Sequence, residues 1–218
     1  MKGGYDVLHL TIFMIVNPSV KYNSSILKKD LDALIFKYPF LKLYTIGYSV
    51  LDNPIYSVKL GFGSKQVCYL ASTHANEYIT TTLLMKFLEN MCIAYYQNSS
   101  ISGYNVKNLL NSTTIYLIPL VNPDGVDLLN GNISSTSNSY IYARYIASKY
   151  PDIPFPNGWK ANIKGVDLKN YQPFCKVLHC LIYTTLLVFP FSFIISSILI
   201  NSSKFSVIEF NFEKLKYI

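Results

Sequence analysis

Two residue types that bind metal ions stand three positions apart near the middle of the chain. His74 and Glu77 lie in the stretch "LASTHANEYITTTLLMKFLE", where a β-rich apolar run gives way to a helical pattern. An imidazole and a carboxylate are both zinc-ligand types, and on a turn that enters a helix this spacing points them toward the same side. In the alternative interpretation, His74 is a polar loop residue and Glu77 is an acid favoured by the dipole of a helix N-terminus. The spacing alone leaves both interpretations open.

Three segments have the apolar spacing of helices. The pattern predicts a helix over residues 24–38, ended by Pro39, a second over 78–96, and a third over 139–149. The second helix begins directly after Glu77, so it would fix the position of the candidate ligand pair. Its predicted core-facing stripe comprises Ile79, Leu83, Leu84, Phe87, Leu88 and Met91.

Strand-like runs separate these helices. The predicted strands cover residues 41–50, 55–61, 66–73, 112–122 and a short piece at 165–168. The stretch "NPDG" at 122–125 is predicted to be a structural turn in which Asn122 and Asp124 bond the backbone. Alternating strands and helices predict an α/β fold with a mixed central sheet flanked by helices, and its first two strands would form an antiparallel edge.

Composition argues against a nucleic-acid-binding protein. Lys and Arg outnumber Asp and Glu by 19 to 12, but the positive charges are scattered and the longest basic run is Lys28-Lys29. A protein that tracks phosphates needs a concentrated basic surface. The four cysteines, Cys68, Cys92, Cys175 and Cys180, form no CxxC pair and have no disulfide-framework spacing.

Several motifs in one order make a more specific signal than the ligand pair. The pattern "THANEYITTTLLMKFLE … TIYLIPLVNPDGVDL … FPNGWKANIKGVDL", over roughly residues 20–168, resembles the zinc carboxypeptidase family. It is most similar to the family's bacterial branch of γ-D-glutamyl-diamino acid endopeptidases, which trim peptidoglycan stem peptides. The resemblance implies one catalytic Zn²⁺ with His74 and Glu77 as ligands, and a peptide or stem-peptide substrate.

The same resemblance gives roles to two further residues. Asp167 in "GVDL" matches a carboxylate that accepts a hydrogen bond from the ligand histidine and fixes its tautomer; a cap at a strand end is the alternative. Lys160 in "WKAN" lies where many relatives carry an arginine that polarises the scissile carbonyl. A lysine ammonium can stabilise a developing oxyanion as a point charge but lacks the planar fork of arginine, and a solvated surface lysine is the alternative.

The resemblance breaks after residue 168. Relatives continue with an Asn-Arg pair that grips a substrate carboxylate, whereas this chain reads Lys169-Asn170. No residue matches the later histidine that completes the zinc site or the later general-base glutamate: His179 comes too soon, and Glu209 and Glu213 lie in an unrelated segment. We therefore expect weak zinc binding and a truncated, inactive form of a zinc metallopeptidase.

The two ends of the chain differ from its middle. We divide the sequence into an N-terminal segment of unclear origin (1–19), the N-terminal part of a zinc carboxypeptidase-like domain (20–170) and an unrelated hydrophobic tail (171–218), so the expected fold is incomplete. Residues 177–200 carry no formal charge, which fits either a frameshift product or a membrane anchor. The apolar run Val7–Val16 resembles a signal-peptide core but contains His9 and lacks a cleavage site. The location, cytoplasm or cell envelope of a bacterium, stays open.

These features support two functions from different classes. The first is a zinc peptidase lineage acting on peptidoglycan peptides. The second is a non-enzymatic remnant, or a membrane-tethered domain that binds cell-wall peptide without cleaving it.

Overall fold

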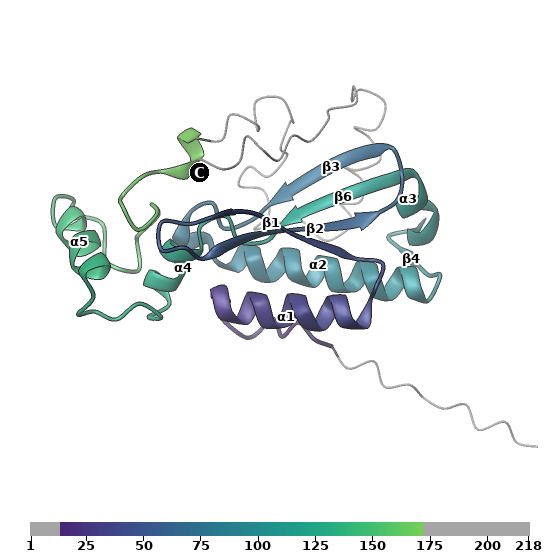
Figure 1. Cartoon of the computed structure of the whole chain (residues 1–218), viewed down its shortest axis with the longest axis horizontal. Coiled ribbons are helices and arrows are strands. Elements are labelled where there is room, and N and C mark those ends of the chain that lie inside the picture. Colours follow the sequence, from purple (N-terminus) through teal and green to yellow (C-terminus); the bar gives the residue numbers. More distant parts are fainter. Residues whose placement is uncertain (1–13, 172–218) are drawn as a thin grey trace, which may run out of the picture.

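The computed structural model of the chain describes residues 14–171, which fold around one four-stranded sheet (Figure 1). The larger helices and strands are α1 (Ser24–Lys37), β1 (Lys42–Tyr48), β2 (Pro54–Gly61), β3 (Lys65–Leu70), α2 (Ile79–Tyr96), α3 (Val106–Ser112), β6 (Thr113–Ile118), α4 (Pro123–Leu129) and α5 (Asn138–Ala147). Short 3₁₀ turns cover Ala75–Glu77 and Leu168–Tyr171, and Ser100–Ile101 (β4) and Tyr104–Asn105 (β5) form a small hairpin.

The sheet is mixed, and its strand order is β1-β2-β6-β3. β1 pairs with β2 and β2 pairs with β6 in antiparallel fashion, whereas β3 and β6 are parallel. This confirms the predicted mixed sheet and its antiparallel β1–β2 edge. Because β3 and β6 are parallel, their carboxyl ends lie at the same edge of the sheet. The segments that follow them therefore start side by side.

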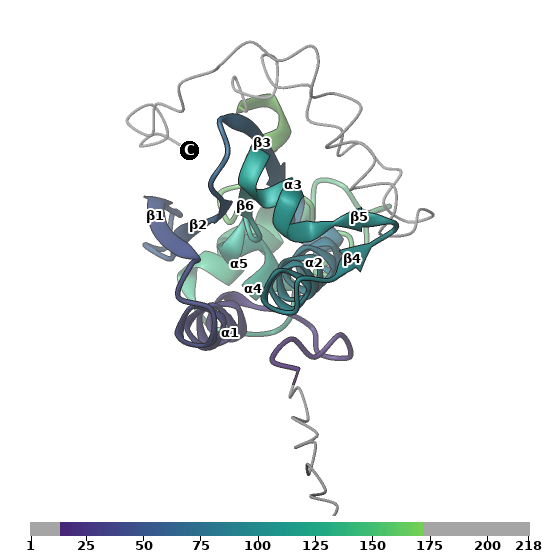
Figure 2. The ribbon, with the colours of Figure 1, turned by 90° about the vertical axis from the view of Figure 1, so that its right-hand side faces the viewer.

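The main core lies between one face of the sheet and the helices α1 and α2, which run alongside each other beneath it (Figures 1 and 2). Its buried residues include Leu31, Leu34, Val58, Phe87, Leu88, Met91, Ile115 and Leu117. The apolar spacing of α1 and α2 thus predicts the correct faces, with two exceptions on the predicted stripe of α2. Ile79, the first residue of the helix, is 53% exposed, and Leu83 is only partly buried.

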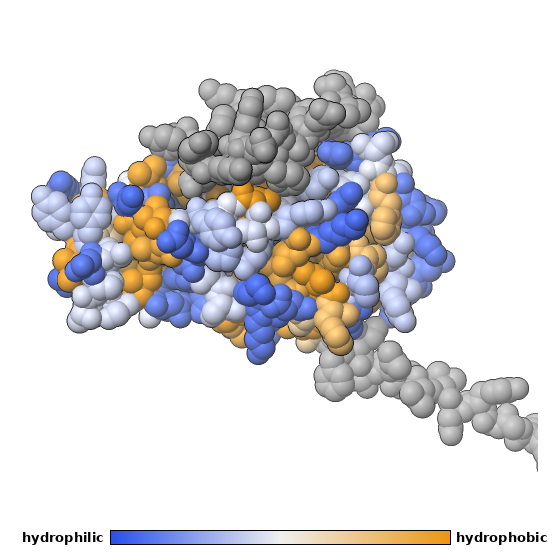
Figure 3. All heavy atoms as spheres, in the orientation of Figure 1, coloured by the Kyte–Doolittle hydropathy of each residue, from blue (hydrophilic) through white to orange (hydrophobic). Residues whose placement is uncertain are grey.

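Two smaller clusters complete the interior. The opposite face of the sheet carries Ile46, Ile55, Ile118, Val121 and Leu168. A third cluster, which we call the end cluster, contains Ala75, Leu128, Ala143, Trp159 and Ile163. Figure 3 shows apolar side chains gathered in separate groups on the face viewed, one of them toward the end of the molecule where α4 and α5 lie.

Two local predictions were wrong. The stretch 122–125 is not an isolated turn, because Asn122 caps helix α4 and Pro123 occupies its first turn, where a missing backbone N–H costs nothing. Asn122 and Asp124 do form the hydrogen bonds expected of them. Residues 165–168 form no strand: Asn162 closes a turn with Gly165 and Val166, and a 3₁₀ turn follows from Leu168. Hydrogen bonds to the Asn162 side chain take the place of the backbone bonds to a neighbouring strand that a strand would form.

Buried acids attach the N-terminal part of the described chain to the helices. Glu89 of α2 is fully buried and accepts hydrogen bonds from the backbone N–H groups of Ile15 and Val16 and from the Lys86 ammonium. Asp127 of α4 accepts bonds from the backbone N–H and the hydroxyl of Ser24 at the start of α1. Burial raises the pKa of the Asp127 carboxyl, against the lowering effect of the Ser24 bonds.

Predictions for the ends of the chain fall largely outside the described range. No helix within residues 14–171 has both the length and the apolar character needed to cross a membrane. The tract 177–200 and most of the run Val7–Val16 lie outside those residues, and so does the tail 171–218 apart from its first residue.

Candidate metal centre

A strained turn after β3 brings His74 to the carboxyl edge of the sheet. Ser72 has a φ of 48°, in the left-handed region that β-carbon-bearing residues seldom adopt. Its N–H donates to Thr80 Oγ1 at 2.8 Å, and its hydroxyl lies 2.6 Å from Thr81 Oγ1 at the start of α2. The polar residues of "TTT" thus hold the turn, and strain of this kind persists only where the surroundings fix it.

The loop after β3 is also joined to the loop after β6. The N–H of Val121 donates to Ala71 O and the N–H of Asn122 donates to Ser72 O, each at 3.0 Å. The parallel pairing of β3 and β6 therefore continues beyond the strand ends as far as Ser72. These backbone bonds consequently fix the position of His74 relative to helix α4.

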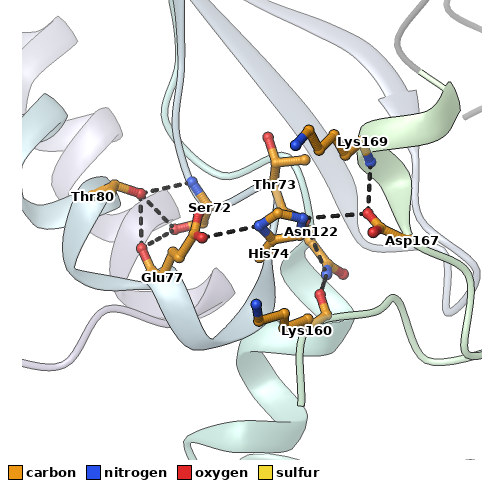
Figure 4. Close-up of polar contacts among 9 residues, drawn as sticks. All are labelled: Ser72, Thr73, His74, Glu77, Thr80, Asn122, Lys160, Asp167 and Lys169. Carbon is orange, nitrogen blue, oxygen red and sulfur yellow. Dashed lines mark hydrogen bonds and ion pairs between the residues drawn. The ribbon is translucent and has the colours of Figure 1, made fainter. Parts of the chain in front are cut away.

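Three of the sequence-predicted residues meet at this edge (Figure 4). His74 Nδ1 lies 2.9 Å from Glu77 Oε1, and His74 Nε2 lies 3.3 Å from Asp167 Oδ1. The His74 side chain is 16% exposed, while the Glu77 and Asp167 side chains are each 47% exposed. These three residues therefore converge at the edge of the sheet where β3 and β6 end, and both carboxylates are partly open to solvent.

Each ring nitrogen of His74 faces a carboxylate oxygen: Nδ1 faces Glu77 and Nε2 faces Asp167. A carboxylate only accepts hydrogen bonds, so a neutral imidazole donates to one of the two acids at a time. With the proton on Nε2, Nδ1 and Glu77 Oε1 present two lone pairs on one side, as two metal ligands do, and the other ring nitrogen is held by a carboxylate as is usual for metal-bound histidines.

These donors fit two positions of a zinc centre. Zinc binds imidazole nitrogen and carboxylate oxygen, and catalytic sites generally have three protein ligands. Among residues 14–171, no group of three or more His, Cys, Asp or Glu side chains is arranged to hold a metal ion. His74 is the one histidine of that range, and the other two in the sequence are His9 and His179.

Lys160 lies beside the His74 loop through its backbone. Its carbonyl accepts a hydrogen bond from the Ala75 N–H at 3.0 Å, and its side chain is exposed (Figure 4). Through this bond, the backbone of Lys160 lies next to Ala75, the residue that follows His74. A role for its ammonium in polarising a carbonyl stays a prediction.

Two asparagines organise this edge in ways that the sequence did not predict, since Asn122 was expected to bond only within its own turn and Asn162 was given no role. Asn122 donates from Nδ2 to the carbonyls of Thr73, Lys160 and Ala161. Asn162 accepts from Lys164 and Val166 N–H groups and closes the turn that precedes Asp167. An Asn directly before "PDG" signals a helix cap, but nothing in the sequence indicates that its other side-chain atom reaches a segment nearly forty residues away.

Comparisons with known proteins match most of the described chain to one family. The zinc carboxypeptidase family model matches residues 27–172. A gamma-D-glutamyl-L-diamino acid endopeptidase of Lysinibacillus sphaericus is 42% identical over 160 residues, covering 73% of this chain and 39% of that protein. The uncharacterised protein YqgT of Bacillus subtilis is 41% identical over 155 residues, covering 70% of this chain and 40% of its own length.

The chain thus spans about two fifths of the length of these relatives. Among solved structures, thrombin-activatable fibrinolysis inhibitor aligns with 70% of this chain and 33% of its own, with a TM-score of 0.49 and 18% identity.

Proposed function

Because this chain belongs to the zinc carboxypeptidase family, we propose that His74 and Glu77 are two ligands of a zinc centre built to hydrolyse peptide bonds. The observation that carries the proposal is the facing pair His74 Nδ1 and Glu77 Oε1, 2.9 Å apart, with Nε2 held by Asp167. We assign this centre to a domain at residues 20–170.

The proposed substrate class comes from the relatives. A protein named for γ-D-glutamyl-L-diamino acid peptides is 42% identical to this chain over 160 residues. We propose the same linkage, which occurs in peptidoglycan stem peptides, as the bond that this site recognises. The exposure of Glu77 and Asp167 is compatible with a substrate that arrives from solvent.

Each residue has a defined task in this proposal. Bound zinc supplies Lewis-acid polarisation and a nucleophile at neutral pH. His74 and Glu77 hold it, and Asp167 keeps the imidazole proton on Nε2 so that the Nδ1 lone pair faces the ion. We assign to the Lys160 ammonium the task of stabilising negative charge that develops on the substrate carbonyl oxygen.

We propose that the 218-residue chain itself binds zinc weakly and does not turn over peptides at a useful rate. Two protein ligands leave the ion exchangeable, and general acid–base help of the kind supplied by the unmatched glutamate is worth about 10² to 10⁴ in rate. Binding of cell-wall peptide without cleavage is the competing function, and the two-donor centre is the observation that favours it.

Metal binding tests the centre directly. We expect the purified chain, dialysed against excess Zn²⁺, to retain substoichiometric metal that mild chelation removes. His74→Ala and Glu77→Ala should each abolish retention, and Asp152→Ala, at an exposed aspartate outside the centre, should not. One tightly held zinc per chain would contradict the two-ligand centre. If His9→Ala or His179→Ala then released that zinc, the missing ligand would be identified.

A hydrolysis assay tests the proposed inactivity. The chain is incubated with added Zn²⁺ and a γ-D-glutamyl-L-diaminopimelate peptide, with Glu77→Ala as control. We expect no product. Product formed by the original chain and not by Glu77→Ala would show a complete catalytic centre and refute the proposed inactivity.

A further inference from the structure

We infer that Asn122 is a positioning residue of the proposed zinc centre. Its side-chain amide ties the loop that carries His74 to the segment 159–167, which carries Lys160 and Asp167. The inference rests on the proposed function for its meaning, but the contacts themselves belong to the protein without metal.

The donor side of the amide faces carbonyl oxygens from two segments. Asn122 Nδ2 lies 3.0 Å from Ala161 O, 3.4 Å from Lys160 O and 3.4 Å from Thr73 O. Asn122 is only 2% exposed, so water cannot replace these bonds. The backbone of Asn122 also donates to Ser72 O, which fixes its distance from the His74 turn. The side chain therefore bridges the residue before His74 and the two residues after Trp159 (Figure 4).

The acceptor side of the same amide has a separate task. Asn122 Oδ1 accepts a hydrogen bond from Gly125 N–H at 3.1 Å, which caps helix α4. This bond requires the oxygen on the Gly125 side and leaves the nitrogen on the carbonyl side, so the amide orientation is settled. Only glycine fits at position 125 beside this amide, because a Cβ there would lie 2.6 Å from Asn122 Nδ2 and 2.7 Å from Ala161 O.

The bridged segment reaches His74 at a second point. Lys160 O accepts from Ala75 N–H, and seven residues later Asp167 accepts from the His74 ring. Between them, Asn162 closes a turn with Val166 N–H at 3.0 Å, which keeps this stretch compact. Loss of the Asn122 donors would release the segment at Lys160 and Ala161. Asp167 would then no longer be held at a fixed position relative to the imidazole.

Another asparagine supplies a matched control. Asn105 caps α3 by accepting a bond from Asn108 N–H at 2.9 Å, and α3 lies at the opposite end of the molecule from α4 (Figure 1). Serine is also a good N-cap residue, but its shorter side chain carries no amide donor. Asn122→Ser should therefore lose the bridge and retain a cap. Asn105→Ser also retains a cap, and the amide contacts that it loses are to Asn98 and not to the segment 159–167. Asn122→Asp, which keeps the volume and turns an acceptor toward the carbonyls, is the second variant.

The first readout needs no metal. Amide hydrogen exchange of Ala75, measured by NMR on the full chain and normalised to a core amide such as Leu117, reports how firmly Lys160 O is held. We expect exchange at Ala75 to quicken about 5- to 30-fold in Asn122→Ser and Asn122→Asp. Asn105→Ser should leave this ratio unchanged.

The second readout is zinc affinity, determined by competition with a chromophoric chelator. We expect a loss of about 10- to 100-fold in the two Asn122 variants, as for other groups that orient metal ligands, and none in Asn105→Ser. Unchanged Ala75 exchange in both Asn122 variants would overturn the inference. So would faster exchange with unaltered zinc affinity, since the bridge would then be merely structural. If the original chain bound no zinc at all, the proposed function would fail, while the Ala75 ratio would still decide whether Asn122 fixes the segment.

Discussion

At the scale of single residues, the centre depends on one imidazole set between two carboxylates. Glu77 lies on the Nδ1 side of His74 and Asp167 on the Nε2 side. Both acids are half exposed, so neither is forced into place by burial. The proposed zinc centre gives the two acids different roles: Glu77 would hold the metal on the Nδ1 side, and Asp167 would orient the ring from the Nε2 side.

Asp167 should therefore affect metal binding without being a ligand. We expect Asp167→Asn to weaken Zn²⁺ binding by about 10-fold, the lower end of the range for such partners, because its bond to His74 is long and half exposed. Asp152→Asn, at an exposed site, should have no effect in the same titration. Complete loss of zinc in Asp167→Asn, equal to that in Glu77→Ala, would show that Asp167 is itself a ligand.

At the scale of elements, helix α2 holds both the Ser72 turn and the first described residues of the chain. Its first turn holds the Ser72 turn through Thr80 and Thr81, and its third turn presents the buried Glu89 to residues 15 and 16. A carboxylate without solvent contact is tolerable only when its partners are all present. Glu89 therefore attaches residues 15 and 16 to the folded unit.

Removal of Glu89 should break this attachment and measurably lower the stability of the protein. We expect Glu89→Ala to lower the free energy of unfolding by about 3 kcal/mol, the low end for a broken buried pair, because Lys86 keeps 18% of its side chain exposed. The matched change is Asp32→Ala, which removes the exposed Lys28–Asp32 pair and should cost less than about 1 kcal/mol. Urea titrations measure both, and equal losses would refute a structural role for Glu89.

At the scale of the whole molecule, the two faces of the sheet are unequal. Helices α1 and α2 cover one face and bury a large core, whereas the other face carries the small cluster around Ile118 and Leu168. The pleat of β6 divides its side chains between them. Ile115 points into the large core and Ile118 into the small one, and both are almost fully buried.

These two isoleucines test where the stability lies. We expect Ile115→Ala to cost about 4 to 5 kcal/mol and Ile118→Ala about 2 kcal/mol, the two ends of the range for such truncations. The difference arises because neighbours on all sides keep a cavity open in the large core, while the thin cluster can relax. Chemical denaturation of both variants provides the measurement. A larger loss in Ile118→Ala would show that the second face is more firmly packed than its cluster indicates.

Periodicity determined the elements that bury an apolar face. Helices α1, α2 and α5 and strands β1, β2, β3 and β6 lie within a few residues of their predicted positions, since burial demands a repeating pattern in each. Prediction failed where short polar side chains shape the backbone. At 165–168, hydrogen bonds to Asn162 produce a turn in place of the predicted strand. At 122–125, the Asn122 cap starts a helix in place of the predicted isolated turn.

The sequence by itself determined the family, the sheet-and-helix order and the pairing of His74 with Glu77, because these depend on neighbours along the chain. Only the tertiary structure decided which groups meet across long separations. It placed Asp167 on the far side of the His74 ring and Asn122 between the Thr73 and Ala161 carbonyls. Those contacts follow from the parallel register of β3 and β6, which brings distant loops to one edge. No local pattern encodes such a register, because it is set by how the whole sheet packs on α1 and α2.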